Sequence, residues 1–246
     1  MEATTIDNTI SATGASTACG SDIKYPSFKS FDEFIDVQRL RSLDGYMTRR
    51  INRRIRETND SLFLNQHRLD ANSPYRPGAR EIWLTRTKPG TPYDYLDLDR
   101  TELWEQTESA AEFTLLMDFI ATLPFKSTGR ILVIYDDTGA AVPAHRDHER
   151  RDICHDFVWF RTNLTKPFYV LNGATGEKLY VHSYSAWFDT VNQYHGSDAA
   201  DGLSFSIRVD GHFTDGFGSG IPRSESEPAS TPSVWACVRH GGGELQ

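Results

Sequence analysis

Hydrophobic residues at helical spacing predict a first helix near the start of the chain. Ser30 and Glu33 stand three positions apart, which is the spacing of a capping box at a helix start. Apolar side chains then recur every three or four residues as far as Leu40. We therefore expect a helix over residues 31–43 that Gly45 brings to an end.

A longer apolar stripe predicts a second helix between Glu105 and Leu123, with Pro124 directly after it. The stripe consists of residues three or four positions apart, namely Ala110, Phe113, Leu116, Met117, Ile120 and Leu123. A helix with one apolar flank buries that flank against another element. Both helices are therefore expected to lie against the outside of a sheet.

After Pro124 the pattern becomes that of β-strands. Runs rich in β-branched and aromatic residues alternate with turn residues: RILVIYD, AVPAHRD, DFVWFR, PFYVLN, KLYVHS, the run 187–191 and SFSIRVD. EIWLTR, over residues 81–86, is predicted as one earlier strand. Short strands at this spacing with few helices predict a mainly β protein, specifically a double-stranded β-helix, a jelly-roll or cupin-like barrel with flanking N-terminal helices.

The two ends of the chain have a different composition from its centre. Residues 1–22 and 216–246 are rich in small and polar residues and have no apolar periodicity, so we expect a flexible N-terminal segment and a loosely ordered C-terminal tail. The remainder, residues 23–215, is predicted to be a single domain, whose motif-bearing β core covers about 129–213.

Composition and charge exclude several partners. Of the 246 residues, 38% are hydrophobic, which is enough for a sizeable core, and the formal charge is −8, which disfavours binding to nucleic acid or an anionic membrane. The sequence contains neither an apolar run long enough for a membrane span nor a signal-peptide pattern, so a cytoplasmic location is expected. Cys19, Cys154 and Cys237 are far apart and suggest neither a disulfide framework nor a thiolate zinc site.

Five arginines form a basic cluster ahead of the predicted β region: Arg49, Arg50, Arg53, Arg54 and Arg56. We interpret the cluster as the solvated face of a helix, and the alternative is that it binds an acidic group of a substrate.

Three residues have the spacing of a metal site. His145 and Asp147 stand two positions apart, so on an extended strand both side chains point to the same face. His195 follows 50 residues later and can complete a set of two histidines and one carboxylate. Such a set leaves three open positions on Fe(II). The alternative is an ordinary His-Asp pair on the surface.

Arg208 stands in the middle of the apolar run SFSIRVD. A buried guanidinium needs an anionic partner, so Arg208 is expected to bind the distal carboxylate of an oxo-acid that chelates the metal at its other end. Alternatively, it faces solvent or pairs with an internal acid such as Asp189. Ser204 and Ser206 share its strand face and make that face small and polar.

The order of these motifs resembles the iron(II)- and 2-oxoglutarate-dependent oxygenases. The run from residue 129 to Thr162-Asn163 is similar to the aspartyl/asparaginyl β-hydroxylase-like branch that includes cis-proline hydroxylases, with Pro143 ahead of the H-x-D motif. The resemblance covers about residues 129–213 and implies His145, Asp147 and His195 as iron ligands.

The resemblance also implies a basic residue on the last strand as the 2-oxoglutarate anchor. Ser206 is expected to contact the co-substrate because it shares the strand face of Arg208. Here the chain departs from the branch in two ways. The anchoring arginine of close relatives falls about where this chain has Ser204, so Arg208 is its nearest equivalent. Where relatives carry an R-x-H pair, this chain has His155 and Phe157, which makes His155 a second candidate contact for the co-substrate.

The function that the resemblance implies is hydroxylation of an unactivated C–H bond, with Fe(II), 2-oxoglutarate and O₂. The expected substrate is a small molecule, namely a free or carrier-bound amino acid, and a peptide or protein side chain is the alternative. Two readings from other classes stay open: a cupin-like metalloenzyme that does not use 2-oxoglutarate, and a non-catalytic β-sandwich binding module. The sequence does not predict the oligomeric state.

Overall fold

The computed structural model describes residues 26, 28–57, 79–91, 98, 100–147, 156–172 and 174–221. His155, the three cysteines, the segment 1–22 and the tail beyond residue 221 lie outside the described residues. The order of elements is β1(Phe28–Ser30), α1(Val37–Ser42), α2(Asp44–Glu57), β2(Ala79–Trp83), β3(Thr85–Thr87), η2(Thr101–Leu103), β4(Trp104–Gln106), η3(Glu108–Phe113), α3(Thr114–Ile120), β5(Phe125–Asp136), β6(Val142–His145), β7(Phe157–Phe160), β8(Phe168–Leu171), β9(Lys178–Val181), β10(Ser185–Phe188), β11(Tyr194–Ser197), β12(Ser204–Phe213) and η4(Phe217–Gly220).

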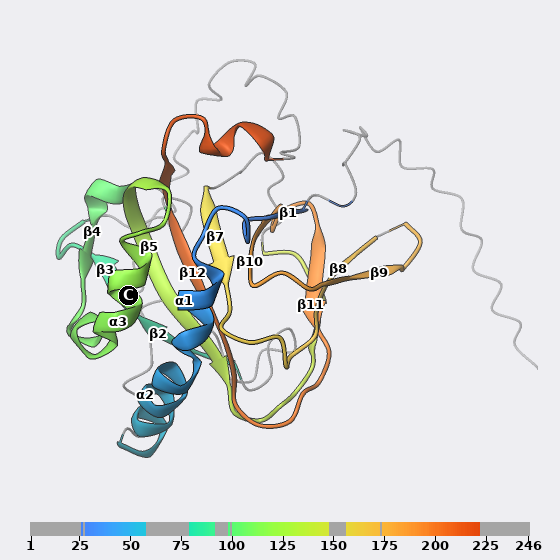
Figure 1. Cartoon of the computed structure of the whole chain (residues 1–246), viewed down its shortest axis with the longest axis horizontal. Coiled ribbons are helices and arrows are strands. Elements are labelled where there is room, and N and C mark those ends of the chain that lie inside the picture. Colours follow the sequence, from blue (N-terminus) through green and yellow to red (C-terminus); the bar gives the residue numbers. More distant parts are fainter. Residues whose placement is uncertain are drawn as a thin grey trace, which may run out of the picture.

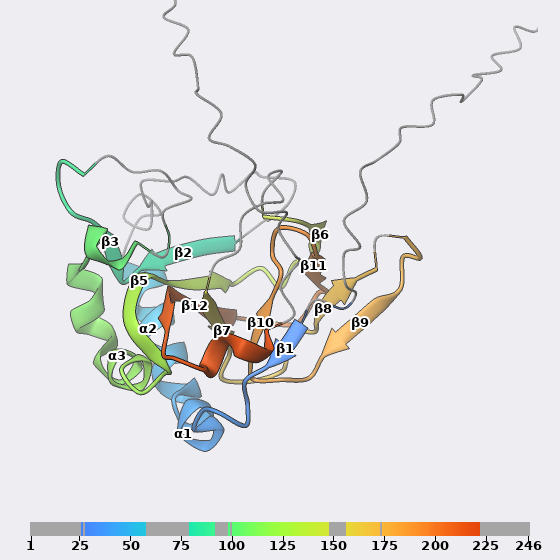
Figure 2. The same ribbon diagram turned by 90° about the horizontal axis from the view of Figure 1, so that it is seen from above.

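Two antiparallel sheets form the body of the protein (Figures 1 and 2). One has six strands in the order β1-β10-β7-β12-β5-β2, and the other has four in the order β6-β11-β8-β9. From β5 to β12 the chain passes repeatedly from one sheet to the other, and residues of both sheets line a common cavity. This arrangement confirms the predicted double-stranded β-helix.

Helices cover the outer face of the six-stranded sheet, as predicted (Figure 1). Leu40 of α1 and Met47 of α2 are fully buried in the core. The ring of Phe119 in α3 packs 5.5 Å from that of Phe160 in β7. Among the described residues, no helix is long and apolar enough to cross a membrane.

The first helix differs from its prediction at both ends. Residue Ser30 ends β1 instead of capping a helix, because residues 28–30 pair with β10 in the six-stranded sheet. Helix α1 begins after Asp36, whose carboxylate accepts a hydrogen bond from the Arg39 amide. Gly45 does not end a helix either, since it is the second residue of α2, where the first turn tolerates glycine.

The second predicted helix is shorter than expected. Glu105 lies in β4, where pairing with β3 outweighs the helical pattern, and only residues 108–120 are helical, first as η3 and then as α3. The apolar stripe itself is buried apart from Met117, which is partly buried. The predicted strand 81–86 is also divided, because the chain bends at Leu84, so that β2 pairs with β5 and β3 pairs with β4.

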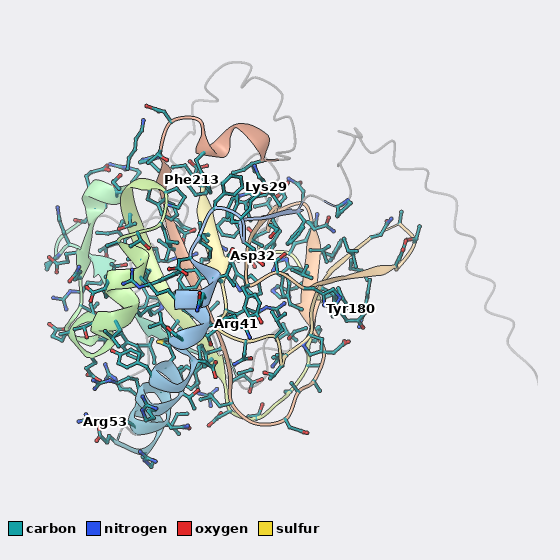
Figure 3. All side chains as sticks on the ribbon, viewed as in Figure 1. Lys29, Asp32, Arg41, Arg53, Tyr180 and Phe213 are labelled. Atoms are coloured by element: carbon teal, nitrogen blue, oxygen red, sulfur yellow. The ribbon has the colours of Figure 1, made fainter. Side chains whose placement is uncertain are left out.

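Helix α2 carries the arginine cluster and confirms its placement on a helix. Met47 and Ile51 face the core, whereas Arg49, Arg53 and Arg56 are exposed on the other side. Arg53 points away from the body of the protein (Figure 3) and pairs with Glu57 one turn further on.

Candidate metal centre

The structure brings His145, Asp147 and His195 together between the two sheets. His145 ends β6 and lies directly opposite His195 of β11 in the four-stranded sheet. Asp147 follows β6 and is held in place by a hydrogen bond from its amide to the Thr190 carbonyl, 2.8 Å long. One ligand atom from each of the three side chains lies within 4.8 Å of the others. The pairing of β6 with β11 therefore brings together residues that are 50 positions apart.

Both histidines are oriented by the same local device. The Nδ1 atom of His145 lies 2.9 Å from the Pro143 carbonyl, and that of His195 lies 3.1 Å from the Gln193 carbonyl. Because a carbonyl only accepts, each Nδ1 carries a proton, and in the neutral imidazole the lone pair for a metal is then on Nε2, the ring nitrogen on the side of Asp147. A backbone carbonyl on the second ring nitrogen is the usual way in which a protein orients metal-binding histidines.

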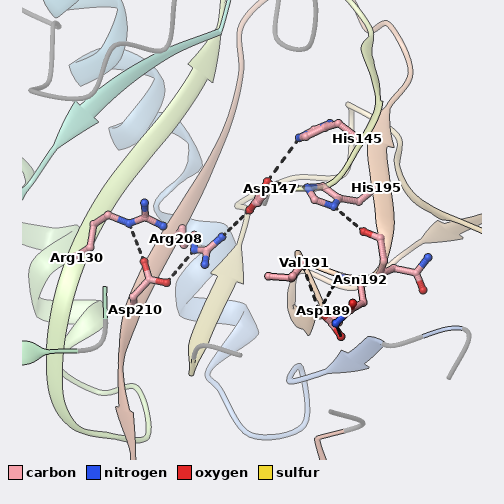
Figure 4. A network of polar contacts seen from close by, with 10 residues as sticks. Arg130, His145, Asp147, Asp189, Val191, Asn192, His195, Arg208 and Asp210 are labelled. Carbon is pink, nitrogen blue, oxygen red and sulfur yellow. Dashed lines mark hydrogen bonds and ion pairs between the residues drawn. The ribbon is translucent and has the colours of Figure 1, made fainter. Parts of the chain in front are cut away.

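A braced turn between β10 and β11 supports this arrangement. The pattern of residues 187–191 predicted a strand, but β10 ends at Phe188. Asp189 closes the turn that follows by accepting hydrogen bonds from the Val191 and Asn192 amides (Figure 4). The Gln193 amide in turn donates to the Asp189 carbonyl. One turn thus places the carbonyl that orients His195 and also the Thr190 carbonyl that holds Asp147.

A chain of buried ion pairs reaches the same carboxylate from the six-stranded sheet (Figure 4). The Nη1 group of Arg208 lies 3.1 Å from Asp147 Oδ2, and its Nε donates to Asp210 Oδ1 at 2.9 Å. The other oxygen of Asp210, which is fully buried, accepts from Arg130 Nε at 2.9 Å. Arg208 therefore pairs with two internal acids, although Asp189 is not one of them.

The geometry of the donors fits a single divalent ion. Asp147 Oδ1 lies 3.7 Å from His145 Nε2 and 3.3 Å from His195 Nε2. Two donors on one ion, each about 2.1 Å from it, can be at most about 4.2 Å apart, so both distances are compatible with shared coordination. Asp147 Oδ2 points away to Arg208, which leaves Oδ1 as the coordinating oxygen. Two imidazoles and one carboxylate form the set that Fe(II) oxygenases use, with further positions open.

The three side chains open into a cavity of about 150 Å³ between the sheets. A cavity that holds a single water needs only about 10–15 Å³, so this cavity has room for a small organic molecule. Ser204, Ser206 and Arg208 all line it, and so does Phe205, which stands between the two serines. Its aromatic wall includes Trp159 and Phe168, whose rings are 4.6 Å apart.

The charged residues of the lining are cations in the majority. Arg161, Lys166 and Arg208 line the cavity together with the carboxylates of Asp136 and Asp147. Burial lowers the pKa of Arg161 to about 10. A divalent ion would add further positive charge, so the cavity suits an anionic ligand.

Sequence reasoning missed three residues that shape the site. Of the three, only Asp210 could have been predicted from the sequence, because it stands two positions after Arg208 and hence on the same strand face. Gln193 acts through its backbone carbonyl, which no side-chain pattern reveals. Lys166 enters the cavity from the loop before β8, where a lone lysine normally indicates a solvated turn.

Comparisons with known proteins found similarity only among solved structures. No protein-family model and no curated protein matches the chain. A prolyl-4-hydroxylase from Pseudomonas putida is similar at 15% identity and a TM-score of 0.42, over 76% of this chain and 92% of the other. For a prolyl hydroxylase from Trichoplax adhaerens, solved with a peptide fragment of hypoxia inducible factor, the identity is 11% and the TM-score 0.43, over 76% and 83%.

A third structure, a 2OG-Fe(II) oxygenase family protein from Burkholderia pseudomallei, is similar at 9% identity and a TM-score of 0.36, over 61% of this chain and 74% of the other. At such low identities and TM-scores, a functional conclusion has to rest on the side chains of the site.

Proposed function

We propose that this protein is an Fe(II)- and 2-oxoglutarate-dependent dioxygenase that hydroxylates an unactivated C–H bond of a free or carrier-bound amino acid. The observation that carries this proposal is the convergence of His145, Asp147 and His195 on one point, with both imidazoles held by backbone carbonyls in the metal-binding tautomer. These three residues would hold the iron.

Bound Fe(II) would supply open positions for a 2-oxo acid and O₂ and the redox chemistry that joins them. In the overall reaction, one oxygen atom enters the C–H bond of the substrate, the other enters succinate, and 2-oxoglutarate loses CO₂. The electrons that reduce O₂ therefore come from 2-oxoglutarate and the substrate, and no external reductant is needed.

The residues of the cavity would bind, orient and shield the reactants. Arg208 has a buried Nη2 group that makes no hydrogen bond to the described residues, so it can donate to an acidic ligand beside the metal. Ser206, on the same strand face, supplies a second polar contact. Trp159, Phe168 and Phe188 line the wall with aromatic surface that excludes water.

The experiment that tests this function starts with anaerobic reconstitution of the full chain with Fe(II). Free amino acids, or peptides that contain the same residues, are then added together with 2-oxoglutarate and O₂. The amount of succinate and the mass of each candidate substrate are measured. An increase by one oxygen atom that depends on 2-oxoglutarate supports the proposal. Metal binding without any consumption of 2-oxoglutarate would instead select a cupin-like metalloenzyme.

A further inference from the structure

The cavity has polar groups at both of its ends, and one face of β12 runs between them. Ser204 and Arg208 both line it from β12, and four residues of extended strand separate their backbones by about 13 Å. Arg208 lies at the end with the candidate metal ligands. Ser204 lies opposite Asp136 of β5, and Lys166 Nζ donates to Asp136 Oδ2 at 2.7 Å. One end is therefore defined by Arg208 and the other by Lys166.

Arg208 is placed to bind a group that also touches the metal. Its Nη1 contacts Asp147, and Nη2, which is bonded to the same carbon, is buried without a hydrogen-bond partner among the described residues. An acceptor at Nη2 would therefore lie directly beside the carboxylate that coordinates the ion. That is the place of the chelating end of a 2-oxo acid, and not of its distal end.

Two carboxylates already occupy the guanidinium of Arg208. Asp147 and Asp210 both pair with it, and Asp210 is shared with Arg130. Because the Nη2 group left for a ligand lies beside Asp147, a distal carboxylate needs a donor at the other end of the cavity.

Lys166 is the cation at the other end. Its side chain is only 15% exposed, and its ammonium donates to Asp136 Oδ2 and to the Ala140 carbonyl, each at 2.7 Å. An ammonium has three N–H groups, so a third donor remains for an acceptor in the cavity. Asp136 holds the lysine in place, because its other oxygen accepts two hydrogen bonds from Thr138.

Arg161, the remaining cation of the lining, is engaged elsewhere. Its guanidinium donates to the backbone carbonyls of Lys166, Val181 and Ser183. It thereby braces the loop that carries Lys166, in a structural role.

We infer that Lys166 binds the distal carboxylate of the 2-oxo acid, and that Arg208 binds its metal-chelating end. This assignment rests on the proposed function and differs from the expectation drawn from the sequence, which placed the distal carboxylate at Arg208. It makes Lys166 the residue that selects a dicarboxylate over a monocarboxylate.

The test compares two acids on the full chain loaded with Mn(II), so that binding is measured without turnover. 2-Oxoglutarate and 2-oxobutanoate, which lacks the distal carboxylate, are titrated calorimetrically into wild type, Lys166→Met and Arg208→Met. A charge-assisted hydrogen bond is worth about 1.5–3 kcal/mol, which corresponds to roughly 10- to 100-fold in affinity. We expect Lys166→Met to lose this factor for 2-oxoglutarate only, whereas Arg208→Met weakens both acids alike.

Two further variants serve as controls, one for poor folding of Lys166→Met and one for the loss of any lysine charge. Lys166→Met/Asp136→Asn removes the cation and its counter-ion together and is expected to show the same loss of preference if the single variant folds poorly. Lys178→Met changes an exposed lysine of β9 and is expected to bind both acids as wild type does.

Three results would overturn the assignment in different ways. If Arg208→Met abolishes the preference for 2-oxoglutarate and Lys166→Met keeps it, the distal carboxylate lies at Arg208. If folded Lys166→Met and Arg208→Met both keep the preference, another residue is the anchor. If Mn(II)-loaded wild type binds neither acid, the proposed function fails, and the assignment of Lys166 fails with it.

Discussion

The two sheets contribute to the candidate metal centre in different ways. The four-stranded sheet supplies imidazole donors, His145 and His195, and each imidazole is oriented by a carbonyl only two residues before it. From the six-stranded sheet come charged groups. Apart from the Arg208–Asp210 pair, which spans two positions, their ion pairs join residues far apart in sequence. Arg208 and Asp147 are 61 positions apart, and Arg130 and Asp210 are 80 apart.

This difference in sequence separation distinguishes two properties of the site, namely metal binding and the stability of the fold. A contact between residues two positions apart needs only the local backbone conformation, so the two histidines can be oriented before the two sheets are assembled. Ion pairs over 60 to 80 residues need β5, β6 and β12 in their final places. We therefore expect substitutions in the four-stranded half to affect metal binding first, and those in the six-stranded half to affect stability as well.

The largest expected effect is the loss of metal binding in His145→Ala. Removal of a coordinating imidazole should cost more than the roughly 10- to 100-fold that outer partners contribute, so Mn(II) binding and succinate production should both disappear. Calorimetric titration with Mn(II) measures this, and a cooperative urea transition checks that the barrel remains folded. His182→Ala, which changes an exposed histidine, is the matched control. Full turnover in His145→Ala would refute the site.

Arg208→Ala should have its main effect on the stability of the metal-free protein. It leaves the Asp147 carboxylate without its guanidinium partner in a largely buried place, and loss of one partner of a buried ion pair typically costs about 3–5 kcal/mol. Urea unfolding of the metal-free protein measures this cost. Addition of Mn(II) should recover part of it, because the ion then compensates the carboxylate. An unchanged unfolding free energy would show that the ion pairs contribute nothing.

Asp136→Asn should give a smaller effect that depends on pH. Burial raises the pKa of Asp136, but hydrogen bonds from Lys166 and Thr138 outweigh burial and hold this pKa below its ordinary value. The charged form therefore stabilises the fold above the unfolded-state pKa of about 4, and this contribution disappears as the pH falls through the lower folded-state pKa. At neutral pH the substitution should cost about 1.5–3 kcal/mol, the value of a hydrogen bond to a charged group.

Urea unfolding at several pH values between 7 and 2 measures the difference between Asp136→Asn and wild type, which should narrow only below about pH 4. Asp201→Asn, at an exposed position, is the control and should match wild type throughout. A difference that stays constant down to pH 2 would contradict the role of the Asp136 charge.

The smallest expected effect is that of Asp189→Ala on metal affinity. The substitution removes the carboxylate that braces the turn before β11 and loosens the Gln193 carbonyl that orients His195. We expect Mn(II) to bind about tenfold more weakly, at the lower end of what outer partners contribute. The buried Val191 and Asn192 amides lose their acceptor, so the unfolding free energy should also fall, by about 1–3 kcal/mol. Wild-type affinity in this variant would mean that His195 needs no such brace.

Much of the barrel could be predicted from the chain because strand patterns are short-range. The runs that became β5, β7, β8, β9 and β12 are recognisable from β-branched and aromatic residues between turns. The errors occurred where a distant partner decided the conformation. Ser30 is extended because β10 pairs with it, and Glu105 is extended because β3 does, although both had helical signals of their own.

The same distinction holds for the candidate site. Alternation along a strand was sufficient to place Ser204 and Ser206 on the face of Arg208, because side chains two positions apart on a strand share a face. Asp147, in contrast, lies beyond the end of β6, and its hydrogen bond to the Thr190 carbonyl holds it beside His145. The sequence by itself therefore determined the mainly β class, the set of candidate ligands and the polar strand face.

Only the tertiary structure decided which partners these side chains have. It placed His195 opposite His145, paired Arg208 with Asp147 and Asp210, and brought Lys166 to the far end of the cavity. Each of these contacts depends on strand register and sheet order. Many pairings are compatible with the local pattern, and burial of the whole core selects one among them, which is why the chain alone could not specify them.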